Sequence, residues 1–339
     1  MPKERSVSVR ETEFQGLPPR LLYVAGIAPR CGSNYLYDLI TRHPECAAVA
    51  EGEDYFLLKL DFLRLFAGSV FRKWRRDWTL KKSASHDDLM AALGSGLATF
   101  LRQNTSASGA QGDARDGGET SLLTVTKTPH VDNIRFFPRV FENGFLVVLV
   151  RDGRAVAEST MRTFGDSFDD AVLTWRTGAR TILDFLNTHG WSSDWHRVVR
   201  YEDVVRDPAG EIECLLDGAG LPAESYPFHM LDDTPVIGSS TYGQSSDQVT
   251  WDEKKKDDSF DPLERFANWD QAQHDRFDWL AGDELRALKY PSSETSSNTA
   301  IRYAHQRLLD LRRVQRHVAE GARAKVRDVL FSYATGTKP

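Results

Sequence analysis

The 339-residue sequence has few cysteines, no long apolar run and no excess of positive charge. Its three cysteines, Cys31, Cys46 and Cys214, are odd in number and lack the spacing of a metal site, so we expect a reduced, metal-free protein. The longest apolar runs, residues 21–28 and 145–150, are too short to cross a bilayer, which predicts no transmembrane segment. A net charge of −6 argues against nucleic acid as a partner, because proteins that bind nucleic acid usually carry a basic face.

The beginning of the sequence is polar and contains no hydrophobic segment, so we expect no secretory signal and a cytoplasmic location. Length and composition indicate one elaborated domain or two small ones. We expect a polar lead-in over residues 1–20 and one domain over residues 21–290. Residues 103–119, rich in Gly, Ser, Ala and Asp, are expected to form a mobile loop in that domain. Residues 291–339 are expected to form a linker and a C-terminal amphipathic helix.

The segment 21–44 joins an apolar run, a loop of small and polar residues, and a helical pattern. Its first eight residues predict a buried strand of a parallel sheet, and apolar residues recur at helical spacing from Tyr35. Such a unit directs backbone N–H groups and the helix dipole at one anion. Arg30 adds a guanidinium suited to phosphate, and Ser33 and Asn34 add short polar side chains. The segment therefore predicts a phosphate site.

This loop lacks the lysine of a nucleoside-triphosphate site. When G-x-x-x-x-G-K-[ST] is counted from Gly26, Cys31 occupies the second glycine position and Gly32 the lysine position. A nucleotide kinase stays an alternative that would also need a carboxylate for magnesium, and a plain turn with a solvated Arg30 is the structural alternative. Cys31 is expected to fill the loop, although a thiol at a helix N-terminus can have a lowered pKa.

Strands alternate with helical patterns from residue 21 to residue 222, which predicts an α/β domain with a parallel sheet covered by helices. Further strands are expected over residues 46–50, 122–125, 145–150 and 197–200. Each strand ends in a polar cluster, and the clusters contain Arg30, Glu53, Lys127, Arg151 and Tyr201. Because parallel strands share the edge at their carboxyl ends, these residues are expected to meet at one site.

Two other segments combine basic and apolar residues. Residues 73–82 are basic, with Trp74 and Trp78 between the charges, and we expect a solvated helix face there. Residues 299–331 predict one long basic helix with an apolar stripe. This helix could cover the core, pair with another subunit or lie on an anionic surface, and its stripe favours packing or a homodimer.

Two motifs together resemble the sulfotransferases that use 3′-phosphoadenosine 5′-phosphosulfate (PAPS), which have a P-loop-like fold. Residues 28–34, APRCGSN, are similar to the 5′-phosphosulfate loop of that family, and residues 146–159, LVVLVRDGRAVAES, are similar to its 3′-phosphate motif. Residues 200–208, RYEDVVRDP, followed by residues 215–222, LLDGAGLP, resemble its adenine-side strand and helix. The resemblance implies that PAPS, or its product PAP, contacts Arg30, Cys31, Gly32, Ser33, Asn34, Tyr35, Arg151, Ser159 and Tyr201.

Within this family, the sequence is most similar to the tyrosylprotein-sulfotransferase-like branch. The likeness rests on V-R-D-G-R-A, on a glutamate after Gly52, and on S-S-D-Q-V at residues 245–249, and it spans residues 21–290. In that branch the last string covers the cofactor, which implies a contact from Ser245. The sequence departs from the branch at Asn34, where Ser or Thr is usual, and at Asn268, where a lysine is usual.

Sulfuryl transfer, like phosphoryl transfer, needs a base for the acceptor proton and positive charge near the leaving oxygen. The resemblance implies Glu53 as the base, and an apolar wall would raise its pKa and suit it to that role. Glu51 and His130 remain alternatives. Lys127 and Arg30 are expected to stabilise the developing charge. The acceptor is expected to be a hydroxyl of a small molecule, glycan, lipid or tyrosine peptide, and a non-catalytic sulfonucleotide-binding protein is the other alternative.

Overall fold

The computed structural model describes residues 20–50, 53–105, 122–237, 239, 253–255, 261–263, 265–291, 300–316 and 318. Contacts divide the chain into two compact units, Met1–Ala267 and Asn268–Pro339, which are described separately here. The division into domains that the sequence suggests stays a prediction. Most of the loop expected at 103–119 lies outside the described residues.

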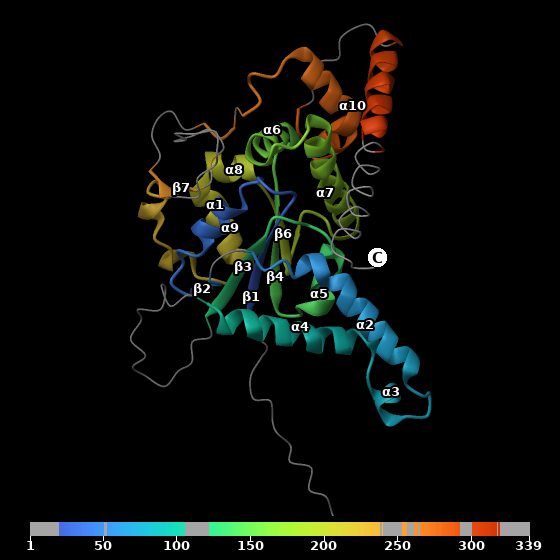
Figure 1. The fold of residues 1–339 in the computed structure, drawn as a ribbon. Helices are drawn as coiled ribbons and strands as arrows, with labels where there is room; N and C mark the ends of the chain where they lie inside the picture. The colour runs from blue at the N-terminus through green and yellow to red at the C-terminus, as the bar shows by residue number, and fades with distance from the viewer. Residues whose placement is uncertain are drawn as a thin grey trace, which may run out of the picture. The chain divides into compact units, whose positions relative to one another are not determined.

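The first unit is built on a six-stranded sheet with the order β2-β3-β1-β4-β6-β5 (Figure 1). The strands are β1 (Leu21–Gly26), β2 (Cys46–Ala48), β3 (Leu123–Thr128), β4 (Gly144–Val150), β5 (Ser192–Ser193) and β6 (His196–Arg200). All neighbouring pairs are parallel except β5 with β6. Every residue of β1, β3 and β4 is buried, as expected for central strands covered on both faces. The predicted parallel sheet is confirmed, with one short antiparallel strand at its edge.

Helices flank this sheet or lead outward from it (Figure 1). They are α1 (Ser33–Ile40), α2 (Leu60–Lys73), α3 (Thr79–Ser83), α4 (His86–Gln103), α5 (Phe137–Val140), α6 (Gly153–Phe164), α7 (Phe168–His189), α8 (Tyr201–Arg206) and α9 (Pro208–Gly218). Short 3₁₀ turns lie at Leu57–Lys59, Ile134–Phe136, Ala223–Ser225 and Phe228–Met230, and β7 (Val236–Ile237) pairs with β8 (Glu253–Lys254). A Cβ on Gly178 of α7 would lie 1.9 Å from the carbonyl oxygen of Ile27, so glycine lets α7 approach the end of β1.

Strands β2 and β3 end at other residues than the sequence predicts, β2 already at Ala48, and helix α8 follows β6 directly. Strand β3 continues to Thr128, so Lys127 lies within the strand and not beyond it. The β-branched residues around Lys127 suit an extended, buried strand. Tyr201 begins helix α8 directly after β6, where the sequence analysis placed only a polar cluster.

The second unit contains α10 (Gln271–Ala287) and a helix over residues 300–316. Arg302 lies 2.6 Å from Asp275, and Arg276 lies 3.0 Å from Asp310, so ion pairs join the two helices. The helix predicted over residues 299–331 is confirmed for its described part. The side chains of its apolar stripe are exposed, namely those of Leu308, Leu311, Val314 and Val318. In the described part of the chain, no helix is long and apolar enough to span a membrane.

Candidate functional site

The loop between β1 and α1 makes a tight turn that depends on one glycine. Arg30 and Gly32 both have positive φ angles, of 72° and 96°. A Cβ on Gly32 would lie 2.3 Å from the Tyr201 ring, so glycine allows both the conformation and the close contact. The backbone N–H of Leu36 donates to the Gly32 carbonyl. The N–H groups of the first turn of α1 come before Leu36 in the sequence and take no part in this bond. The loop therefore has the form of an anion site at a helix N-terminus.

Cys31 points away from this site. Its side chain is fully buried beneath the turn, next to Gly26, and its backbone N–H donates to the carbonyl of Ala28 at 3.3 Å. Burial raises the pKa of the Cys31 thiol. The alternative of a thiol with a lowered pKa is therefore wrong, because the side chain is enclosed and not presented at the helix terminus. Cys31 fills the loop, and its contact with a cofactor stays a prediction.

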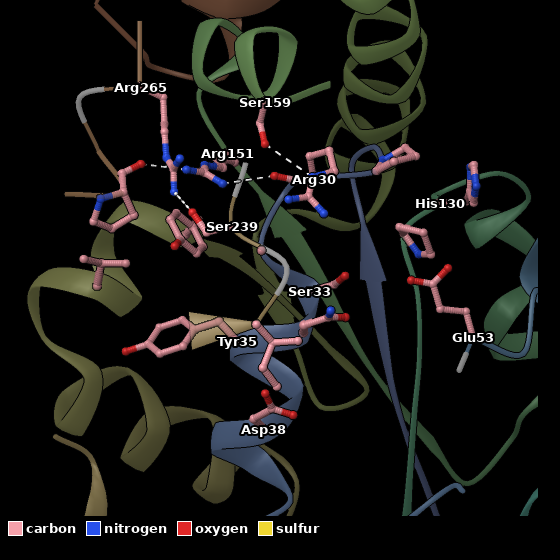
Figure 2. Close-up of a pocket in the computed structure, with 18 of the residues that line it drawn as sticks. Arg30, Ser33, Tyr35, Asp38, Glu53, His130, Arg151, Ser159, Ser239 and Arg265 are labelled. Carbon is pink, nitrogen blue, oxygen red and sulfur yellow. Dashed lines mark hydrogen bonds between the residues drawn. The ribbon is translucent and has the colours of Figure 1, made fainter. Parts of the chain in front are cut away.

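Three arginines gather beside the turn (Figure 2). Arg151, which follows β4, donates to the backbone carbonyls of Arg30 at 3.0 Å and Pro262 at 2.6 Å. Arg265 donates to Ser239 Oγ at 3.0 Å. Burial, followed by the charges of Arg151 and Arg265, lowers the pKa of Arg30 to about 10. The cluster thus holds like charges close together in a partly buried place, where a bound anion would offset their repulsion.

Ser159 belongs to the same cluster. It lies on α6, two helical turns beyond Arg151, and its Oγ accepts a hydrogen bond from Arg30 Nε at 3.3 Å. The Nε of Arg151 is buried and has no hydrogen-bond partner among the residues that the structure describes. A buried donor without a partner is costly, so a ligand oxygen would suit this position. Arg30, Arg151 and Ser159 therefore meet as the two phosphate motifs predict.

A second group of polar residues lies across Arg30 from this cluster (Figure 2). Lys127 Nζ lies 3.3 Å from Glu53 Oε1, and Tyr55 donates its hydroxyl to Glu53 Oε2 at 2.5 Å. The hydrogen bond to Glu53 raises the pKa of Tyr55 to about 12. Glu53 thus contacts the ammonium of Lys127 and the phenol of Tyr55. These polar contacts, and not the apolar wall expected from the sequence, are its main surroundings. His130 lies nearby, with its ring centroid 5.9 Å from that of Tyr55.

The neighbouring carboxylate, Asp54, anchors this segment to the sheet. It accepts hydrogen bonds from the hydroxyl of Tyr23, from Thr126 Oγ1 at 2.6 Å and from the backbone N–H of Phe56 at 2.7 Å. Burial raises the pKa of Asp54. Because Tyr23 lies on β1 and Thr126 on β3, these contacts fix the chain directly after Glu53 against the strands. The sequence analysis did not identify this role of Asp54.

One cavity of about 540 Å³ connects the two groups, a volume typical of small-molecule sites (Figure 2). Its lining includes the predicted residues Arg30, Gly32, Ser33, Asn34, Tyr35, Glu53, Arg151, Ser159 and Tyr201, and also His130. Other lining residues were not predicted, among them the polar side chains of Asp38, Tyr55, Ser239 and Arg265. Lys127 is not among the described residues that line the cavity, and it contacts Glu53, which is one of them. Ser245 and Glu51 lie outside the described residues.

The cavity also contains an unusual carboxylate. Burial raises the pKa of Asp38 to about 6, against the opposing charges of Lys127 and Arg42. Asp38 lies on α1, a little over one turn beyond Ser33. The cavity thus has guanidinium groups at one end and two carboxylates, those of Asp38 and Glu53, elsewhere in its wall.

Curated proteins offer a partial match to the sequence. The chain is similar to carbohydrate sulfotransferase 1 of mouse, at 24% identity over 165 residues, and of human, at 26% over the same length. These matches cover 41% of this chain and 39% of each relative, so the matched region is less than half the length of the relatives.

Solved structures are similar at a low level. The sulfotransferase domain of the curacin biosynthetic pathway has a TM-score of 0.44 and 17% identity, covering 82% of this chain and 99% of that one. A mouse sulfotransferase complexed with PAP has a TM-score of 0.41 and 10% identity, covering 80% of this chain and 86% of that one. The model of the sulfotransferase family matches residues 23–225, which is more than half of the chain. The chain therefore belongs to the sulfotransferase family.

Proposed function

We propose that the protein transfers a sulfuryl group from PAPS to the hydroxyl of an acceptor. The proposal rests on one cavity that joins two groups of residues. Arg30, Arg151 and Arg265 line one end, and the carboxylate of Glu53, which is ion-paired with Lys127, lies on the other side of Arg30 (Figure 2). Membership of the sulfotransferase family supports the reaction class.

The arginine end fits a nucleotide with two phosphate groups. Arg151, Ser159 and Arg265 would hold the 3′-phosphate, because the orphaned Nε of Arg151 and the crowded positive charge both favour a dianion. Arg30 and the first turn of α1 would hold the 5′-phosphosulfate. Tyr201, beneath Gly32, would bound the adenine side. When bound, the nucleotide supplies the sulfuryl group and a phosphate as leaving group.

The acceptor end supplies the base. Glu53 would take the proton from the acceptor hydroxyl, since it lines the cavity and its position is fixed by Lys127, Tyr55 and the anchored Asp54 beside it. Lys127 would hold this carboxylate and contribute positive charge near the reacting groups, together with Arg30. His130 also lines the cavity and is the rival base.

The acceptor class is the least constrained part of the proposal. A glycan hydroxyl is the first candidate to test, because the curated relatives are named carbohydrate sulfotransferases. Hydroxyls of small molecules, lipids and tyrosine peptides are the other candidates. A nucleotide kinase and a non-catalytic sulfonucleotide-binding protein are the alternatives in other classes. A cytoplasmic location and a homodimer formed through the helix at 300–316 stay predictions.

The test of this function is transfer from sulfur-labelled PAPS to a panel of glycans, phenols, lipids and tyrosine peptides. We expect one class to become labelled without added magnesium, and the label to be lost in the Arg151→Ala variant. PAP binding without transfer to any acceptor would favour the non-catalytic alternative. Magnesium-dependent ATP binding would favour the kinase.

A further inference from the structure

Helix α2 carries an apolar face that points away from the sheet. Leu60 and Ala67 are fully buried on its inner side. On the outer side, Phe62, Leu65 and Phe66 are 60%, 52% and 53% exposed. These three side chains recur at helical spacing and so form one continuous patch, which we call the α2 apolar face. Apolar patches of this kind, bordered by charge, mark interaction sites.

Basic residues surround the α2 apolar face. Lys59 lies at its N-terminal end, with Nζ 5.9 Å from the centre of the Phe62 ring. Arg72 and Lys73 are exposed at its C-terminal end. Residues 59–82 contain eight Lys or Arg against two Asp, so this segment has a charge of +6 in a chain whose net charge is −6. Positive charge is therefore concentrated on the α2–α3 segment.

Helix α3 and Trp78 directly before it also combine exposed apolar side chains with basic ones. Trp78 and Leu80 are 46% and 53% exposed, and the basic side chain of Lys82 beside them is exposed as well. Figure 1 shows α2 leading outward from the sheet to α3 at the edge of the first unit. The basic residues over 73–82 are largely solvated as expected, but α2 ends at Lys73 and α3 begins at Thr79, so they do not form one helix face. The segment also exposes the indole of Trp78 and the side chain of Leu80.

We propose that the α2–α3 segment is a docking surface for a membrane that contains anionic lipid. An amphipathic helix with Lys and Arg beside exposed Phe, Leu and Trp binds at the boundary between headgroups and acyl chains. A symmetric dimer through this segment is a poorer occupant, because two segments of charge +6 would repel each other. A soluble polyanion would pair with the basic residues but would leave Phe62, Leu65 and Phe66 in water. An anionic bilayer accommodates both kinds of side chain, since its headgroups pair with Lys and Arg and its acyl chains cover Phe and Leu.

The test is co-sedimentation of the full-length protein with vesicles, which needs neither nucleotide nor acceptor and so does not depend on the proposed function. Vesicles of phosphatidylglycerol and phosphatidylcholine in equal amounts should bind the protein at least about tenfold more strongly than phosphatidylcholine alone. The triple variant Phe62→Ser, Leu65→Ser, Phe66→Ser should lose at least about tenfold of this binding. Because the changed side chains are already exposed, circular dichroism should confirm that the variant remains folded.

The matched control is a triple variant at another exposed apolar stripe on a basic helix, Leu308→Ser, Leu311→Ser, Val314→Ser. It should bind the anionic vesicles as the unaltered protein does. If this control loses binding while the α2 variant keeps it, the proposal is overturned in favour of the C-terminal helix. Equal binding to both kinds of vesicle, or α2-variant binding equal to that of the unaltered protein, would also overturn it.

Discussion

The ammonium of Lys127 lies 3.3 Å from Oε1 of Glu53, so the expected base and the expected electrostatic stabiliser form one ion pair. The family resemblance implies a separate role for each residue, with Glu53 as the base and Lys127 as a stabiliser of the developing charge. Their contact means that replacing either residue disturbs the other, because a partly buried charge then loses its partner. The two roles therefore have to be separated by combined substitutions.

Glu53→Gln should slow turnover by about 10²- to 10⁴-fold while leaving PAP affinity nearly unchanged, because the amide cannot accept the acceptor proton. Steady-state kinetics measures the turnover, and calorimetry measures the affinity for PAP. Glu51→Gln and His130→Ala are the rival variants. A fully active Glu53→Gln enzyme with an inactive His130→Ala enzyme would contradict the carboxylate mechanism.

Lys127→Met, combined with Glu53→Gln, tests whether the lysine acts through the carboxylate. If Lys127 only positions Glu53, the double variant should turn over no more slowly than the slower single variant. Multiplied effects would instead assign Lys127 an independent role at the leaving oxygen.

Gly32→Ala should destabilise the fold by about 1 to 3 kcal/mol, since the new Cβ meets the Tyr201 ring and the φ of 96° is strained for alanine. The free energy of unfolding in urea measures this. Gly96→Ala is the control, because no atom lies within 4 Å of its Cβ position in helix α4. That variant should be stabilised by about 0.5 to 1 kcal/mol. Equal stability of the two variants would contradict the close packing of Gly32 against the Tyr201 ring.

Asp38→Asn should stabilise the protein at pH 7.5 by roughly 1 to 3 kcal/mol. The pKa of Asp38 is about 6 in the folded state and about 4 when unfolded, so the folded state binds this proton more tightly. Stability therefore falls as the pH rises from about 4 through 6, and the gain from asparagine should vanish near pH 3.5. Unfolding titrations at both pH values test this, with the exposed Asp233→Asn as control. A gain that persists at pH 3.5 would show that ionisation is not its cause.

Local patterns in the sequence were sufficient for the sheet and for much of the site. Fully buried strands have nearly continuous apolar sequences, so β1 and β4 were predictable, and the polar residues after them fell at one edge. The paired phosphate motifs placed Arg30, Arg151 and Ser159 together correctly.

Other parts of the site depend on contacts between distant segments. Arg265 arrives beside Arg151 from a segment more than 100 residues later, and no periodic pattern marks it. The pairing of Glu53 with Lys127 depends on the extent of β3 and on the positive φ of Tyr55, neither of which local sequence specifies. The raised pKa of Cys31 follows from its burial, which only the packed structure reveals.

The central claim, a site for a nucleotide with a 3′-phosphate, is tested most directly by calorimetry of PAP against AMP without metal. We expect PAP to bind at least about 100-fold more tightly than AMP, because three charge-assisted contacts would address the extra phosphate. Arg265→Ala should remove at least about tenfold of that preference without changing AMP affinity, and the exposed Arg206→Ala should change neither. Equal affinity of the unaltered protein for PAP and AMP would contradict the account.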